Sequence, residues 1–300
     1  MSRVCRIALL VISLCVTFLC GCGVPLTRPD HLPATTCERV DNVRLIAASK
    51  LVFFGELHGT AESPTLIGEV ACKAAHERPV VVALEWPVDL QSAVTKFLES
   101  KGEKQAADEL LRHRFWRTEM LDGKSSASML RLVDRLRFLR SQGSSIDIIL
   151  FDDPVESTSQ STGRENRLAD RLLNVFRARS IETQILVLTG NLHSRVTRGL
   201  PWNSDFEPAA YLLRNLKPLT FELGHTGGAA WNCGRDQCSS RNFKANLSEN
   251  LKLRTPSLIL GAEISDGHHG FFLLGQSPRH RPQFSRLPQT SVATLDWVIP

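Results

Sequence analysis

The chain has 300 residues, of which 42% are hydrophobic and 22% are charged, and its formal net charge at pH 7 is +5. Arg3 and Arg6 belong to an apparent export signal, so the mature chain carries about +3, which indicates neither nucleic-acid binding nor strong steering of anions. The roughly 280 residues that remain are enough to bury one large core or two smaller ones.

Residues 1–21 have the pattern of a lipoprotein signal peptide. After the positive start, the apolar run IALLVISLCVTFL has the length of a signal core but is short for a membrane-spanning helix. Cys22 follows Gly21, and a small residue before a cysteine resembles the bacterial lipobox. On this interpretation Cys22 carries lipid and anchors the chain in the cell envelope. Because Gly23 is not an inner-membrane retention acid, we expect the outer membrane, facing the periplasm. An ordinary cleaved signal is the alternative.

Four cysteines remain beyond Cys22, an even number that suits an exported protein. Cys233 and Cys238 flank GRDQ in a polar, Gly-rich stretch, which predicts a local disulfide. Cys37 and Cys72 form a second candidate pair, with a buried free thiol at Cys72 as the alternative.

The predicted organisation places a Pro-rich tether at 22–40 and a single α/β domain at 41–300. Within that domain, 225–256 is expected to be an inserted loop closed by the disulfide.

Apolar runs rich in Val, Ile, Leu and Phe, with little alternation, predict buried strands at 50–57, 79–86, 145–153 and 183–190. The segments between them predict helices. In the first predicted helix, Ser63 can serve as the N-cap and Pro64 suits the first helical position. An apolar stripe then continues to Ala74. The other predicted helices span 88–101, 104–114, 125–141 and 164–179. Alternating strands and helices predict an α/β fold with a mostly parallel central sheet flanked by helices.

The C-terminal third has a different pattern. Apolar runs predict strands at 218–224, 257–264 and 269–275, and only the short SDGH segment separates the last two. A hairpin is therefore expected, which would add antiparallel edge strands to the sheet.

Each of the first four predicted strands ends in polar residues that a core would exclude. These residues are Glu56, His58 and Glu62 after the first strand, Glu85 at the second, Asp152 and Asp153 at the third, and Asn191, His193 and Arg195 after the fourth. The carboxyl ends of parallel strands share one edge of the sheet, where open α/β folds bind ligands. The pattern therefore predicts an active or binding cleft at this edge.

Each of these residues also has a structural explanation. Glu85 could cap a helix or pair with an arginine, and His58 could be a hydrogen-bonded loop histidine. Asp152 and Asp153 precede Pro154 and could form a turn. The functional interpretation depends on the coincidence at four strand ends.

Several short motifs resemble a superfamily that joins the erythromycin esterases, the Tiki and TraB proteins and the haem-binding ChaN lipoproteins. Two are Gly-x-x-His motifs, GELH at 55–58 and GNLH at 190–193. Glu62 follows in HGTAE, and Glu85 ends the next predicted strand. RENRLA at 164–169 matches a further element that opens a helix. The resemblance covers about residues 50–200 and implies an α/β fold with a central sheet.

The esterase branch implies hydrolysis by an activated water. The implied catalytic set is His58, Glu56, Glu62, Glu85, His193 and Arg164. His58 would be the general base, a glutamate would orient it, and Arg164 or His193 would bind charge. No Gly-x-Ser-x-Gly motif occurs, so a serine nucleophile is not expected.

Two other branches imply a cofactor. Similarity to the Tiki branch would make His58, Glu62, Glu85 and His193 ligands of a divalent metal such as Zn or Mn. The ChaN branch binds haem through a tyrosine ligand. This chain has one tyrosine, Tyr211, and its position cannot be matched to that ligand. The other candidate haem ligands are His225, His268 and His269, although two histidines in the DGHHG turn are also typical of a solvated turn.

The sequence therefore predicts a membrane-anchored lipoprotein that hydrolyses an ester or amide in a small molecule or peptide. The alternative is a lipoprotein that binds haem or another small ligand without catalysis. The sequence does not decide whether the protein uses a divalent metal, haem or no cofactor. The expected partners are the substrate and the membrane, and no nucleic-acid partner is expected.

Overall fold

The computed structural model describes residues 36–117, 123–155, 163–233, 238–247 and 255–274. The predicted signal peptide and Cys22 lie outside the described residues. In the part of the chain that is described, no helix combines the length and apolar character needed to cross a membrane.

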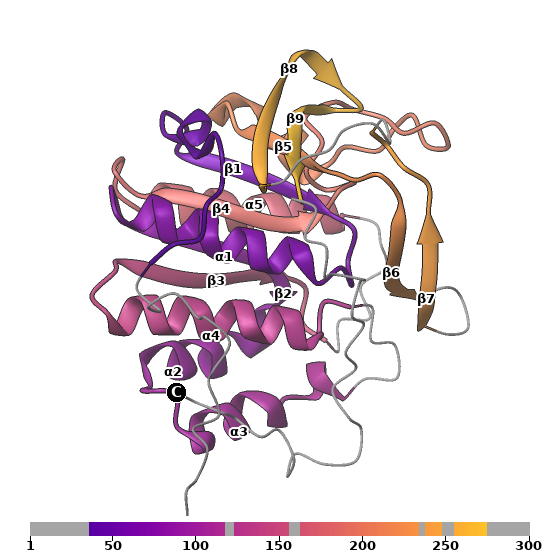
Figure 1. The fold of residues 1–300 in the computed structure, drawn as a ribbon. Helices are drawn as coiled ribbons and strands as arrows, with labels where there is room; N and C mark the ends of the chain where they lie inside the picture. The colour runs from indigo at the N-terminus through magenta and orange to yellow at the C-terminus, as the bar shows by residue number, and fades with distance from the viewer. Residues whose placement is uncertain (1–35, 118–122, 156–162, 234–237, 248–254, 275–300) are drawn as a thin grey trace, which may run out of the picture. The chain divides into compact units, whose positions relative to one another are not determined.

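A seven-stranded sheet forms the centre of the fold, with strand order β3-β2-β4-β1-β5-β9-β8 (Figure 1). Neighbouring strands pair in parallel from β3 to β9, and β8 alone pairs antiparallel, with β9. The strands are β1 Leu51–Glu56, β2 Val80–Pro87, β3 Ile146–Asp152, β4 Gln184–Gly190, β5 Leu219–Gly224, β8 Ser257–Ser265 and β9 His268–Leu273. The predicted α/β class and the antiparallel C-terminal edge are confirmed.

Helices cover both faces of the sheet. They are α1 Glu62–Ala75, α2 Gln91–Glu99, α3 Lys104–Arg112, α4 Ala127–Ser141, α5 Arg164–Ala178 and α6 Ala209–Leu212, with short 3-10 turns η1 Val43–Ile46, η2 Val88–Leu90, η3 Arg114–Trp116 and η4 Arg214–Leu216. One core cluster joins the sheet to α1, α2 and α4, and a second joins it to α5 and α6.

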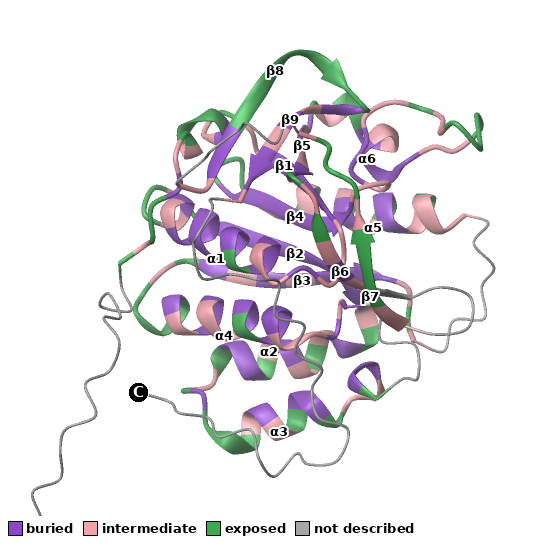
Figure 2. Ribbon diagram, turned by 45° about the vertical axis from the view of Figure 1, so that its right-hand side comes forward, coloured by how far each residue is buried: buried purple, intermediate pink, exposed green. Residues whose placement is uncertain are grey.

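This two-sided cover explains why the strand sequences do not alternate. In β1, Val52 and Phe54 belong to the first cluster, whereas Leu51 and Phe53 belong to the second. All of β1 is therefore buried (Figure 2). Full burial of a large apolar side chain contributes about 1.5–3 kcal/mol, so Phe53 and Phe54 contribute strongly to the position of this strand.

The start of α1 differs from the expectation. The helix begins at Glu62 with Ala61 at its N-cap, so Ser63 is not the cap. The Ser63 hydroxyl instead lies 2.9 Å from the hydroxyl of Thr60. Gly59, in the turn between β1 and α1, has φ +86°, a conformation that glycine adopts without strain.

The inserted segment contains more regular structure than the expected loop. Strands β6 Gly228–Cys233 and β7 Cys238–Phe243 form a separate antiparallel hairpin. Cys233 and Cys238 face each other in its register, and Cys238 is disulfide-bonded. The side chain of Cys233 lies outside the described residues, so its pairing with Cys238 stays a prediction.

A disulfide joins Cys37 to Cys72, the pair that the sequence left open. The segment before the sheet is also held by hydrogen bonds. Glu38 N donates to Glu69 of α1 at 2.6 Å, and Arg135 of α4 donates to both Glu69 and the carbonyl oxygen of Thr36. The last residues of the predicted tether are therefore attached to α1 and α4.

Candidate active site

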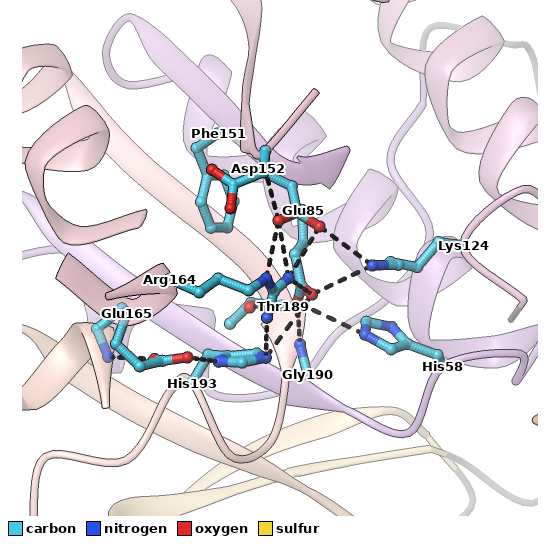
Figure 3. A network of polar contacts seen from close by, with 12 residues as sticks. His58, Glu85, Lys124, Phe151, Asp152, Arg164, Glu165, Thr189, Gly190 and His193 are labelled. Carbon is cyan, nitrogen blue, oxygen red and sulfur yellow. Dashed lines mark hydrogen bonds and ion pairs between the residues drawn. The ribbon is translucent and has the colours of Figure 1, made fainter. Parts of the chain in front are cut away.

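The carboxyl ends of the four central strands meet at one edge, because β3, β2, β4 and β1 are consecutive neighbours in the sheet. These strands supply Asp152, Glu85, Gly190 and Glu56 respectively. Polar contacts link most of the predicted rim residues into one network (Figure 3).

Glu85 is the centre of the network, and its side chain is only 4% exposed. One carboxylate oxygen accepts hydrogen bonds from Thr189 Oγ1 at 2.6 Å and from Gly190 N at 2.7 Å. The other accepts from Arg164 Nη2 at 2.8 Å and lies 3.4 Å from Lys124 Nζ. Burial alone would raise the pKa of Glu85, but the charge of Lys124, together with the charge and hydrogen bond of His58, holds it well below its ordinary value. Glu85 is therefore a carboxylate held between cations.

Asp152 and Arg164 extend the network toward β3. The guanidinium of Arg164 reaches both oxygens of Asp152 at 2.8 Å, and Lys124 Nζ lies 3.2 Å from the same carboxylate. Burial opposes the charge on Arg164, but Glu85 and Asp152 outweigh burial and raise its pKa. Two cations thus lie beside two carboxylates in a partly buried site.

His58 lies between two carboxylates. Its Nδ1 is 3.0 Å from Glu56 Oε1 and its Nε2 is 3.5 Å from Glu85 Oε2. Burial alone would lower the pKa of His58, but the charge of Glu85 and the hydrogen bond to Glu56 outweigh it and raise the pKa to about 10. His58 is therefore an imidazolium at neutral pH.

His193 has the opposite hydrogen-bonding pattern. Its Nε2 lies 2.9 Å from Arg164 Nη1 and its Nδ1 lies 2.7 Å from Glu165 Oε1. A guanidinium can only donate, so Nε2 must be the acceptor and Nδ1 carries the proton that Glu165 accepts. The contacts thus assign His193 as a neutral imidazole. Glu165 is itself fixed, because its second oxygen accepts from Ala209 N at the start of α6, at 2.9 Å.

The glycine of each Gly-x-x-His motif lies so close to the other motif that a side chain would not fit there. A methyl group built on Gly55 would lie 2.1 Å from Ser194 Oγ, directly after the second motif. A methyl group built on Gly190 would lie 3.1 Å from His58 Nε2 and 3.4 Å from His193 Cδ2. Because β1 and β4 are adjacent, a side chain at either glycine would push the two histidine loops apart.

The structure brings together Glu56, His58, Glu85, Arg164 and His193 from the predicted catalytic set. Glu62 is the exception: it lies at the first position of α1, and no hydrogen bond or ion pair joins it to the network among the described residues.

Other polar residues near the predicted edge pair elsewhere. Asp153 pairs with Arg167 and Arg171, and Arg195 pairs with Asp266.

Sequence reasoning did not place Lys124, Glu165 or Thr189 in the site. Glu165 is the acid of the RENRLA element, so its motif could have identified it. Lys124 lies in a loop without any periodic pattern, and only the fold places it beside Glu85.

The donor set does not suit a divalent metal. Both oxygens of Glu85 already accept hydrogen bonds, and Nε2 of His193 accepts one from Arg164. The cations Arg164 and Lys124 lie beside the carboxylates and would repel a metal ion. Among the described residues, the one group with metal-ligand spacing is Cys37, Cys72 and His76, whose two sulfurs form the disulfide.

The candidate haem ligands are already engaged with other groups. A solvated turn was one of the two alternatives for His268, but its side chain is only 2% exposed. Its Nε2 contacts Ser194 and its Nδ1 contacts the carbonyl oxygen of Asp266. His269 Nδ1 contacts Thr220. The His225 ring packs edge-on against Phe243, and Arg214 lies over the Tyr211 ring. These contacts give no support for axial ligation.

Comparison with known proteins shows the fold. No family model matches the chain, and no curated protein matches it in sequence. An erythromycin esterase mutant, EreC in its open conformation, matches with a TM-score of 0.58 and 9% identity over 81% of this chain and 94% of that chain. A succinoglycan biosynthesis protein matches with a TM-score of 0.54 and 11% identity over 77% of this chain and 89% of that chain. A bacterial protein toxin matches with a TM-score of 0.45 and 13% identity over 69% of this chain, which spans 39% of the toxin's length. The chain therefore has an erythromycin esterase-like fold.

Proposed function

We propose that the chain is a hydrolase that cleaves an ester or amide in a small molecule or peptide with a water activated by a histidine–carboxylate pair. The observation that carries this proposal is the pair of histidines on either side of Glu85, one protonated and one neutral. Two groups whose surroundings set them in opposite protonation states are the usual arrangement of a general acid and a general base.

The neutral imidazole of His193 is the proposed base. Glu165 orients it through Nδ1, which directs the lone pair of Nε2 into the site. In the proposed reaction Arg164 turns from His193 toward the developing oxyanion, and the attacking water passes its proton to Nε2. Arg164 and Lys124 supply positive charge beside the reacting carbonyl, where charge stabilisation is worth most.

The imidazolium of His58 is the proposed acid. Its raised pKa argues against the role of general base that the family resemblance implies, because a protonated ring cannot take a proton from water. In the proposed reaction His58 gives its proton to the leaving group, and Glu56 keeps the ring in place. The lipid anchor at Cys22 and the outer-membrane location stay predictions.

The pH dependence of hydrolysis tests these roles. Purified mature protein would be assayed with p-nitrophenyl acetate and an acyl-p-nitroanilide, and kcat/KM measured across the pH range around the His58 pKa of about 10. We expect kcat/KM for the anilide to fall as pH rises through this value, since its leaving group needs the proton that His58 then loses. The ester should show a smaller fall, because p-nitrophenolate leaves without being protonated. A rate that instead rises through it would make His58 the base.

Variants provide the second arm of this test. His58→Ala and His193→Ala should each lower kcat by on the order of 10²-fold or more while the chain stays folded by circular dichroism. His76→Ala is the matched control, because His76 is an exposed histidine at the other end of α1. Folded His58→Ala and His193→Ala variants that keep the wild-type rate would overturn the proposal.

A further inference from the structure

The β6–β7 hairpin, which comes from the inserted segment, contacts the candidate active site through its backbone. Trp231 N in β6 donates a hydrogen bond to the carbonyl oxygen of Gly59 at 3.3 Å. Gly59 directly follows His58. Figure 1 shows the hairpin on the side to which the arrows of β1 and β4 point. The contact therefore lies at the same edge of the sheet as the polar network.

Two glycines allow three chain segments to meet at this point. Gly59 has φ +86°, and a methyl group built there would lie 2.0 Å from the carbonyl oxygen of Trp231. Gly123 has φ +87°, and a methyl group on it would lie 2.4 Å from Gly59 Cα and 2.9 Å from the same carbonyl oxygen. Gly123 directly precedes Lys124. The hairpin backbone thus contacts the loops that carry His58 and Lys124, two of the charged groups facing Glu85.

Contacts at both ends of the hairpin stiffen it, so it can serve as a fixed support. An isolated two-stranded hairpin is marginally stable in water. Here Cys238 is disulfide-bonded at the turn end of the ladder. At the other end, the His225 ring packs against Phe243 with ring centroids 4.4 Å apart, and Asn246 Oδ1 accepts from His225 N at 2.8 Å.

We propose that Trp231 is a positioning residue, whose backbone holds the Gly59 and Gly123 turns together and so fixes His58 and Lys124 against Glu85. This inference rests on the proposed function for its catalytic consequence, but the contact itself can be tested without a substrate. It extends the site into the C-terminal third of the chain, which carries none of the motifs that define the catalytic set.

Gly123→Ala separates the three segments, because the added methyl group meets the backbone of both Gly59 and Trp231. The matched control is Gly143→Ala, since Gly143 also has a positive φ, +95°, but a methyl group there meets nothing within 4 Å. A second pair acts from the hairpin side: Trp231→Pro removes the N–H donor, whereas Trp231→Ala keeps it. All variants would be made in the full mature chain and checked for folding by thermal melting.

Hydrogen–deuterium exchange is the first measurement. Gly123→Ala and Trp231→Pro should speed exchange by roughly tenfold or more in peptides covering 55–62 and 228–233, whereas Gly143→Ala and Trp231→Ala should not. Equal exchange in Gly123→Ala and Gly143→Ala would overturn the inference, whether or not the protein hydrolyses either probe.

Steady-state hydrolysis of p-nitrophenyl acetate is the second measurement. We expect Gly123→Ala to lower kcat by on the order of tenfold with KM changed less than about twofold, the pattern of misplaced catalytic groups. An unchanged kcat in a variant with faster exchange would reduce the contact to a structural one and overturn the positioning role. If the exchange pattern holds but the wild type cleaves neither probe, the contact stands and the proposed function falls.

Discussion

At the residue scale, the chemistry of the site depends on which groups contact the two ring nitrogens of each histidine. Glu56 and Glu85 contact both ring nitrogens of His58 and keep the ring charged. Arg164 donates to one nitrogen of His193, which keeps that ring neutral. Two imidazoles from similar Gly-x-x-His motifs therefore acquire different chemistry, and neighbouring side chains decide the difference.

Glu165→Gln should separate the orientation of His193 from its presence. The carboxylate accepts from both His193 Nδ1 and Ala209 N, whereas an amide can turn its NH₂ toward Nδ1 and favour the wrong tautomer. We expect kcat to fall by on the order of 10²-fold with KM little changed, measured on the p-nitrophenyl ester. Glu182→Gln, at an exposed position, is the control. A Glu165→Gln variant with wild-type kcat would exclude His193 as an oriented base.

At the scale of elements, the ends of α1 have separate tasks. Its first turn lies beside the loop that carries His58, whereas Cys72 lies roughly 15 Å further along the helix and forms the disulfide with Cys37. The disulfide closes a sequence separation of 35 residues and attaches the segment before the sheet. We infer that it contributes to stability and has no part in the chemistry.

Cys37→Ser tests that division. Loss of a crosslink of this span should lower the free energy of unfolding by about 3–4 kcal/mol in the chain-entropy model. Urea denaturation would measure this loss, and kcat should stay within about twofold of the wild type. A variant with unchanged stability would contradict the estimate, and one whose kcat falls by an order of magnitude or more would connect the disulfide to the site.

At the scale of the whole molecule, the sequence predicted the strands and the edge of the sheet better than the site. Runs such as PVVVALEW are buried on both faces, so composition alone identifies them as strands of a covered sheet. Their polar ends then predict where the cleft lies. The strand order β3-β2-β4-β1 leaves no trace in the sequence, and it places Asp152 of β3 beside Glu85 of β2, where Arg164 contacts both. Glu62 stays outside the network because it lies in the first turn of α1. Lys124 was missed for the same reason, because long-range packing alone places it.

The stability of the whole molecule should pass through a maximum near the ordinary histidine pKa of about 6.5, because two histidines titrate in opposite directions. Burial lowers the pKa of His268 to about 4, and Arg195 opposes its charge while Asp266 favours it. Glu222 also faces His268, at 4.0 Å from Nδ1. Between about pH 6.5 and 4 the unfolded chain binds a proton that the folded chain excludes. Stability should therefore fall by up to about 3 kcal/mol as pH drops through this window.

His58 makes stability change with pH in the opposite direction, because its folded-state pKa of about 10 lies above the unfolded value. Its contribution is fully present below about pH 6.5 and is lost as pH rises through about 10. Urea denaturation at acid, neutral and alkaline pH would measure both effects. His268→Gln should flatten the acid side of the curve only, and His58→Gln the alkaline side only. A wild-type stability that keeps rising between pH 6.5 and 10 would mean that the carboxylates around His58 do not hold it in the charged form.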